Sequence, residues 1–176
     1  DPDVIAAVQA ALQHLTPARR ARDADELELV LQRLGDLDET ELMARSHGSA
    51  AVVRGWIETL TRARRVLAVR INGAARYLAV QDLALYRDAL GVVPPVGLSE
   101  AVLEQFEGAL PELVVRYARS RGPFQLAQLA ARFGLRPAQL EAPLELAQRD
   151  GRLVSGTMLA QVAGLQYCDV EVLRRR

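Results

Sequence analysis

The chain is poor in the residue types that build metal, disulfide and nucleotide sites. It has no lysine, one cysteine and two histidines, His14 and His47, which lie far apart. The single Cys168 excludes an internal disulfide, and one cysteine with two histidines falls short of the roughly four ligands of a zinc site. Without lysine there is no Gly-Lys-Ser/Thr phosphate loop, and no nucleophile elbow occurs either. We therefore expect no catalytic residue, no metal site and no cofactor in this chain.

Long apolar segments are missing too. No hydrophobic run approaches the roughly 18 residues of a membrane-spanning helix, and no signal peptide precedes the first predicted helix. Together with the lone cysteine this favours a reducing compartment, and we expect a cytoplasmic protein without membrane contact. The chain begins at Asp1 without an initiator methionine and stops within Arg174–Arg176, so we also expect an excised piece of a longer protein.

Arginine is the abundant charged residue. All 22 basic residues are arginine, and 22 acidic residues balance them to a net charge of zero. A neutral chain has no global field that attracts nucleic acid, so any binding must come from local clusters. Arginine suits such clusters because its guanidinium pairs with phosphate through two hydrogen bonds, which lysine does not do. Half of the 176 residues are hydrophobic, which is enough for the packed core of one or two domains.

One helical unit occurs twice at a fixed offset. The stretch LGDLDETELMARS from Leu34 aligns without a gap with RGPFQLAQLAARF from Arg121, and Gly35 falls on Gly122 (122 − 35 = 87). Self-similarity at a fixed period indicates repeated supersecondary units. The same offset aligns further apolar and basic pairs: Leu42 with Leu129, Arg45 with Arg132, Val53 with Leu140, Ile57 with Leu144, and Val66 with Leu153.

Each unit has the pattern helix, helix, turn, helix and then an apolar strand. That is the order of a winged helix-turn-helix domain, so we predict a mainly α (α+β) fold of tandem winged helix-turn-helix units with short β-hairpin wings. Apolar runs around Asn72-Gly73 predict the first wing. Asp38 followed by Glu41 predicts a capping box at the second helix of the first unit. In the second unit, Pro143 is expected to bend or shorten the third helix.

The pattern divides the chain into four segments. A leading helix and connector are followed by the first unit, a linker that contains Pro94-Pro95, and the second unit, which ends in a truncated helix. The predicted boundaries are 1–23, 24–91, 92–109 and 110–176.

Arginines on the third helix and wing of the first unit are the candidate nucleic-acid contacts. The third helix is the one that enters a major groove, and wing arginines commonly contact phosphates. The predicted nucleic-acid-binding residues are Arg54, Arg62, Arg64, Arg65, Arg70 and Arg76. We expect the wing to make most phosphate contacts, because Glu58, Glu141 and Glu145 lie on the outer faces of the third helices. The alternative is that these arginines pair with acidic residues on a solvated face. Other arginine groups are Arg19, Arg20 and Arg22; Arg116, Arg119 and Arg121; and Arg174–Arg176.

Two stretches resemble the Lhr family, the large helicase-related superfamily 2 DNA helicases. They are RYARSRGPFQLAQLAARFGLRPAQLEAPLELAQRDGRLVSG and QYCDVEVLRRR, within which Tyr167 replaces an expected Trp. The upstream LQHLTPARRARDADELELVLQRLGDL and YRDALGVVPP resemble the long C-terminal extension of the large bacterial members. The resemblance covers nearly the whole chain.

The resemblance implies that ATP and Mg²⁺ bind motor domains outside this chain. It implies a non-catalytic DNA-binding and scaffolding role in DNA repair, with single-stranded or duplex DNA, other domains of the same helicase and a second copy of the chain as candidate partners. One alternative is a protein–protein docking or oligomerisation module. Another is part of an AlkZ-like DNA glycosylase region, for which Gln166 and Asp169 are the nearest candidates, although no catalytic motif matches residue by residue.

Overall fold

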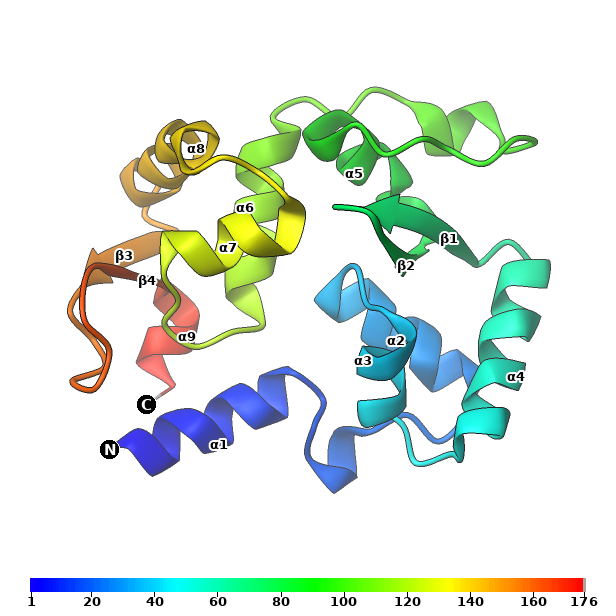
Figure 1. The fold of residues 1–176 in the computed structure, drawn as a ribbon, viewed down its shortest axis with the longest axis horizontal. Helices are drawn as coiled ribbons and strands as arrows, with labels where there is room; N and C mark the ends of the chain where they lie inside the picture. Colours follow the sequence, from blue (N-terminus) through cyan, green and yellow to red (C-terminus); the bar gives the residue numbers. More distant parts are fainter. Residues whose placement is uncertain (176) are drawn as a thin grey trace.

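Two units, each of three helices followed by a two-stranded antiparallel hairpin, make up most of the computed structural model, which describes residues 1–175 (Figure 1). The first unit contains α2 (Ala24–Leu34), α3 (Glu39–Ala44), α4 (Ala50–Arg62), β1 (Val66–Ile71) and β2 (Ala74–Ala79). The second contains α6 (Ala109–Arg119), α7 (Leu126–Phe133), α8 (Pro137–Arg149), β3 (Leu153–Gly156) and β4 (Gln166–Asp169). The predicted mainly α fold of tandem winged-helix units is confirmed.

Three further α-helices flank the units. They are α1 (Pro2–Leu12), α5 (Leu83–Leu90) after the first hairpin and α9 (Val170–Arg174) after the second. The leading helix α1 lies along the second unit, not the first, and the two chain ends are neighbours (Figure 1). Ile5 and Val8 of α1 face Gly122 and Val172 across a small apolar hollow, which explains this placement. No helix within residues 1–175 has the length and apolar character needed to cross a membrane.

Side-chain caps place the helix starts in the first unit. Asp23 accepts a hydrogen bond from the Glu26 amide at 2.8 Å and so begins α2. Asp38 and Glu41 form the predicted capping box, with reciprocal hydrogen bonds of 2.7 and 3.0 Å. In the second unit, Pro143 does not shorten α8, because α8 and α4 each comprise 13 residues. The shortening considered for this helix therefore does not occur.

The 87-residue offset survives in three dimensions. Val53 and Leu140 are both completely buried, and the equivalent bridges Leu37–Tyr77 and Phe124–Tyr167 close both hairpins onto the loop before the second helix. The loop of the second wing is longer, so the tyrosines are offset by 90 instead (167 − 77 = 90). The repeated apolar positions therefore encode the same packing twice.

The first hairpin contributes to both cores. Val66 and Ala79 pack in the cluster of the first unit, whereas Leu67 and Leu78 pack in a cluster that contains α5, α6, α7 and α8. At the tip, the Asn72 side-chain amide donates a hydrogen bond to a backbone carbonyl of α7 at 3.1 Å. The first wing is therefore clamped between the units, not a free projection.

Candidate nucleic-acid interface

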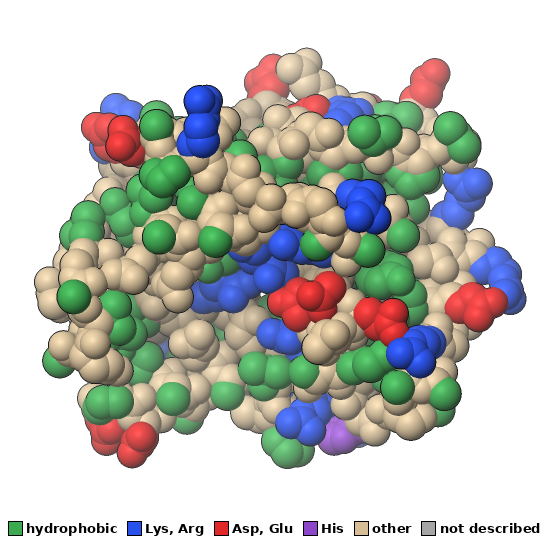
Figure 2. Space-filling view, in the orientation of Figure 1, with side chains coloured by type: hydrophobic (Ala, Val, Ile, Leu, Met, Phe, Trp, Pro, Cys, Tyr) green, Lys and Arg blue, Asp and Glu red, His purple; other side chains and the backbone are tan. Residues whose placement is uncertain are grey.

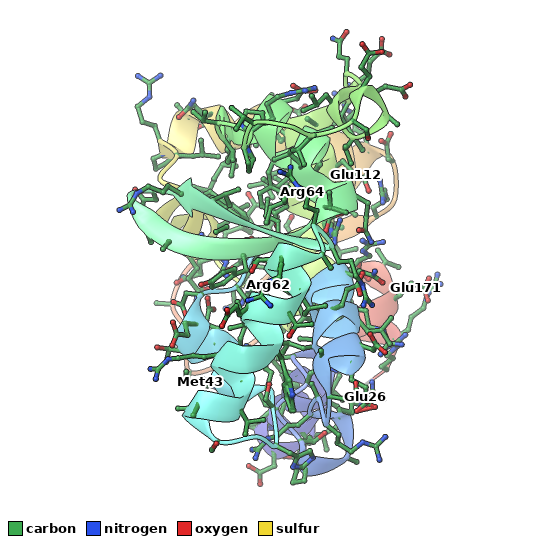
Figure 3. All side chains as sticks on the ribbon, turned by 90° about the vertical axis from the view of Figure 1, so that its right-hand side faces the viewer. Glu26, Met43, Arg62, Arg64, Glu112 and Glu171 are labelled. Carbon is green, nitrogen blue, oxygen red and sulfur yellow. The ribbon has the colours of Figure 1, made fainter. Side chains whose placement is uncertain are left out.

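The outer face of α4 borders a groove that is open to solvent. The groove has a volume of about 780 Å³ and lies between α4, strand β1 and the linker. Arg54, Arg62 and Arg64 line it together with Glu39 and Glu58. Figure 3 views this side of the molecule, with Arg62 over α4 and Arg64 next to the start of the hairpin. Three of the six predicted arginines therefore come together at the third helix of the first unit.

Acidic side chains accompany two of these arginines. Arg54 pairs with Glu39 at 2.5 Å and Arg62 pairs with Glu58 at 2.6 Å, and all four side chains are exposed. Exposed ion pairs of this kind contribute little net stability, so a phosphate can replace the carboxylate at low cost. Arg64 instead donates hydrogen bonds of 3.2 and 3.1 Å to the carbonyls of Val96 and Gly97 in the linker. The groove is therefore a mixed-charge surface, not a purely basic one.

The other three predicted arginines lie elsewhere. Arg65 bonds to Asp25 at 2.9 Å and also to Glu28, and these hydrogen bonds raise its pKa and tie the hairpin to α2. Arg70 is exposed near the hairpin turn, where it donates to the carbonyl of Gly73 at 2.8 Å. Of the six predicted arginines, only Arg54, Arg62 and Arg64 line the α4 groove.

Arg76 requires a correction to the sequence-based prediction. Its side chain is 10% exposed and forms an ion pair of 2.8 Å with Asp36, whose side chain is 3% exposed. A buried arginine that already has a buried counterion would have to give up that ion pair to reach a DNA phosphate. Arg76 therefore belongs to the interior of the protein in this structure.

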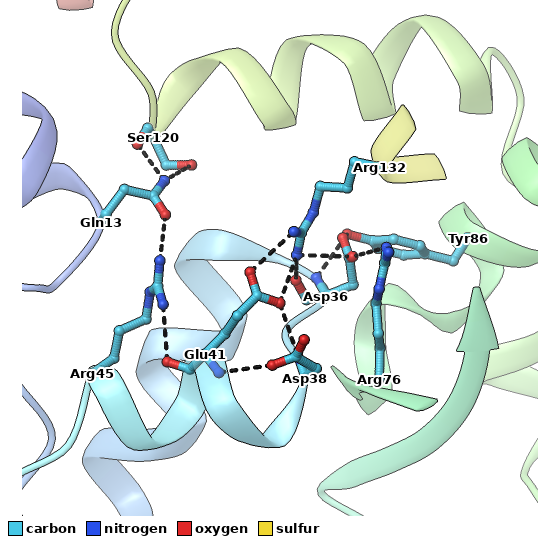
Figure 4. Close-up of polar contacts among 9 residues, drawn as sticks. All are labelled: Gln13, Asp36, Asp38, Glu41, Arg45, Arg76, Tyr86, Ser120 and Arg132. Atoms are coloured by element: carbon cyan, nitrogen blue, oxygen red, sulfur yellow. Dashed lines mark hydrogen bonds and ion pairs between the residues drawn. The ribbon is translucent and has the colours of Figure 1, made fainter. Parts of the chain in front are cut away.

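Asp36 is the centre of a polar network between the units (Figure 4). Besides Arg76, its carboxylate accepts a hydrogen bond from the Tyr86 hydroxyl at 2.7 Å and lies 3.2 Å from a guanidinium nitrogen of Arg132, which comes from α7. Arg132 also pairs with Glu41 at 3.0 Å. Burial would lower the pKa of Arg132, but the charges of Asp36 and Glu41 outweigh it and raise the pKa. The network fastens the second unit to the first.

A second buried ion pair joins the units on another side of the interface. Both terminal nitrogens of Arg116 in α6 bond to the carboxylate of Asp82, one of them at 2.7 Å. One of them also donates to the carbonyl of Gln32 in α2 at 2.6 Å. Because such forked pairs fix both distance and orientation, the two units are held in one arrangement.

Arginines also gather in a hollow between the two halves of the molecule, which Figure 2 shows face-on. Arg121 stacks on the ring of Tyr117, with its guanidinium carbon 4.1 Å from the ring centre. Burial and the positive charge of Arg132 lower the pKa of Arg121. Burial and the charges of Arg121 and Arg132 likewise lower the pKa of Arg45, against the opposing charge of Glu41. Sequence reasoning missed this grouping, although Arg45 and Arg132 are counterparts in the repeat.

The two glycosylase candidates have structural roles. Gln166 is 1% exposed, and its side-chain oxygen accepts a hydrogen bond from the Leu159 amide at 3.0 Å, which holds the loop of the second wing. Asp169 caps α9 by accepting from the amides of Glu171 and Val172 at 2.8 and 3.1 Å. Across the described residues, His, Cys, Asp and Glu side chains do not assemble in threes as a metal site would require.

Comparison with known proteins places this architecture in a family. The family described as "Large helicase-related protein, winged-helix domain" matches residues 1–105. The "Lhr helicase/ probable uracil glycosylase" of Mycolicibacterium smegmatis is 42% identical over 174 residues, which cover 99% of this chain and 11% of that protein. The "Lhr helicase/uracil glycosylase" of Escherichia coli is 34% identical over 155 residues, 88% of this chain and 10% of that protein. The chain thus spans about a tenth of the relatives it matches, and it belongs to the winged-helix domain family of the large helicase-related (Lhr) proteins.

Proposed function

We propose that this chain is a non-catalytic, DNA-engaging tandem winged-helix region of an Lhr-type DNA repair helicase. The observation that carries the proposal is the open groove along α4, where Arg54 and Arg62 stand on the helix that enters DNA in related folds. Their exposed pairs with Glu39 and Glu58 can be exchanged for phosphates. Arg70, exposed at the hairpin turn, adds a further candidate contact.

The proposal also assigns a scaffolding role. The shared core and the buried pairs Arg132–Asp36 and Arg116–Asp82 hold the two units in a fixed relation, so their outer surfaces are presented to DNA or to neighbouring domains as one body. In this proposal the ATP and Mg²⁺ chemistry belongs to motor domains of the parent helicase, in the bacterial cytoplasm. A preformed surface loses less conformational entropy on binding than a flexible one, which favours a scaffolding role for the two units.

Salt-dependent DNA binding tests the proposal. We expect the chain to bind fluorescent duplex DNA with an affinity that falls steeply with salt, with a log–log slope of about −0.9 per phosphate contact. The variant Arg54→Ala/Arg62→Ala should weaken binding and reduce the slope by about two contacts. Arg149→Ala, an exposed arginine at the end of α8, is the matched control. A chain that binds neither single-stranded nor duplex DNA at low salt would disprove the proposal.

A docking function is the second candidate, and the linker favours it. The apolar side chains Val93 and Val96 are 82% and 90% exposed, and Val96 lies at the edge of the α4 groove. Exposed apolar groups next to a groove are typical of contacts with another domain or a second copy. If the docking candidate is right, Val93→Asp/Val96→Asp should abolish self-association in light scattering, or binding to the isolated motor, while DNA affinity stays unchanged.

Uracil excision, which the names of both relatives mention, is the third candidate. No residue of this chain is assigned to it, because Gln166 and Asp169 are engaged in structural hydrogen bonds. Release of uracil from DNA by the pure chain would favour this candidate over the other two.

A further inference from the structure

A second groove, distinct from the one along α4, runs past the C-terminal ends of α1, α2 and α6. It consists of two adjoining hollows of about 350 and 340 Å³ that share His14, Arg19 and Arg33. Arg119 and Arg175 complete the lining of the first hollow on its far side. Residues from both units and from the leading segment therefore meet here, although they are far apart in the sequence.

The groove is strongly basic in a chain with no net charge. Among residues 1–175, none that lines the first hollow is acidic. The second hollow includes one carboxylate, that of Glu26, which is paired with Arg22 at 3.0 Å. Concentrated charge of one sign in a cleft focuses the field and raises the local concentration of anions. The groove therefore has the electrostatic character that the α4 groove lacks.

Three arginines of this groove are also free to bind. Within residues 1–175, the guanidinium groups of Arg19, Arg33 and Arg119 make no hydrogen bond and no ion pair, and all three residues are exposed. Arg119 lies near enough to Asp82 to affect its pKa, but Asp82 is 6% exposed and both of its oxygens are bonded to Arg116. A phosphate that enters the groove displaces no carboxylate, whereas one that binds at α4 must do so.

A buried bridge keeps the groove in shape. The side-chain amide of Gln13, just after α1, donates to the carbonyl oxygen of Ser120 at 2.5 Å and lies 3.1 Å from its hydroxyl. Arg45 donates to the Gln13 side-chain oxygen at 2.8 Å from the other side. Because Ser120 directly follows Arg119, this bridge fixes the backbone on which that arginine stands.

We propose that this basic groove, formed by Arg19, Arg33, Arg119 and Arg175, binds successive phosphates of a DNA backbone. The inference rests on the proposed DNA-engaging function and identifies a second contact surface for it. Unpaired guanidiniums give charge-assisted hydrogen bonds to phosphate without the loss of an existing partner. Such contacts read no sequence, so the groove positions the DNA while any base contact lies elsewhere.

Matched double variants test the groove. We expect Arg33→Ala/Arg119→Ala to weaken duplex binding by about tenfold or more at moderate salt and to reduce the log–log salt slope by about 1.8, the value for two phosphate contacts. Arg149→Ala, also exposed and unpaired within the described residues, should change both quantities little.

Three outcomes separate this inference from the proposed function. If Arg33→Ala/Arg119→Ala binds DNA like the control while Arg54→Ala/Arg62→Ala does not, the groove is ruled out and the α4 surface stands. If the wild-type chain binds no DNA, both ideas fail. Arg33 and Arg119 lie in the last turns of α2 and α6, where a basic side chain also offsets the helix dipole. Reduced thermal stability with unchanged DNA binding would assign them that role alone and overturn the inference.

His14 provides an independent test of phosphate binding in the groove that needs no variant. Burial and then the positive charges of Arg33, Arg19 and Arg45 lower its pKa, against the hydrogen bond with the Arg19 carbonyl. A phosphate in the groove would offset those charges, so DNA should raise the pKa of His14 in an NMR titration. A pKa of His14 that is the same with and without saturating DNA would contradict the inference.

Discussion

The third helices of the two winged-helix units have the same length, but the surfaces of the two units are very different. In the first unit, α4 carries Arg54 and Arg62 along an open groove, and its hairpin is clamped against the second unit. In the second unit, α8 exposes Glu141 and Glu145, and its hairpin packs within its own unit. The comparison shows that the repeated apolar positions maintain the fold, while the polar positions differ: arginines line an open groove at α4, and carboxylates are exposed on α8.

The polar network between the two units should be most sensitive to substitution at Asp36. Asp36→Asn leaves Arg76 and Arg132 buried without their shared counterion, and we expect a loss of about 3–5 kcal/mol in the free energy of unfolding. Asp150→Asn, an exposed carboxylate at the end of α8, is the control for the loss of one charge. Urea unfolding measures both variants. Equal stability of the two variants would show that the network does not hold the units together.

Equivalent glycines should respond differently to the same substitution. Gly35 has φ +82°, and a Cβ there would lie 2.4 Å from the hydroxyl of the buried Tyr86. Gly122 has no positive φ, and the nearest atom to its Cβ would be the exposed Gln9 side-chain oxygen, at 3.1 Å. We expect Gly35→Ala to cost on the order of 1–3 kcal/mol and Gly122→Ala less than about 1 kcal/mol. Calorimetric melting of both variants decides this, and a larger loss for Gly122→Ala would refute the asymmetry.

The smallest effect should appear on acidification. Burial and the neighbouring arginines lower the pKa of His14 below its usual 6.5. The folded state therefore prefers the neutral ring, so the stabilisation is present above about pH 6.5 and is lost as pH falls through the folded-state pKa. Unfolding free energies of the chain and of His14→Gln, compared from neutral pH to about pH 5, should converge on acidification. A constant difference between the two unfolding free energies across that range would exclude His14 as the source of the pH dependence.

The sequence predicted the apolar framework well and the polar contacts poorly. Val53 and Leu140 could be paired from the repeat alone, because burial at helical spacing leaves a local pattern. Arg76 could not be placed, because an arginine in a hairpin looks the same in sequence whether it meets a phosphate or the buried Asp36. A signal for the clamped wing was present, since Val66 and Leu67 put apolar side chains on both faces of β1.

The basic groove could not be assembled from sequence for a related reason. Arg19, Arg33 and Arg119 come from three segments that meet only in the folded chain. Each of them also resembles an ordinary surface arginine, because nothing local shows that it lacks a partner. Arginines that bind DNA are identified by which carboxylates are absent around them, and that depends on tertiary structure.

Backbone amide chemical shifts, measured on titration with duplex DNA, test the contrast between α4 and α8 more directly than any substitution. We expect shift changes along residues 50–62 of α4 and around the basic groove, with little change along residues 137–149 of α8. Changes confined to α8, with α4 and the basic groove silent, would contradict the division of labour between the two units.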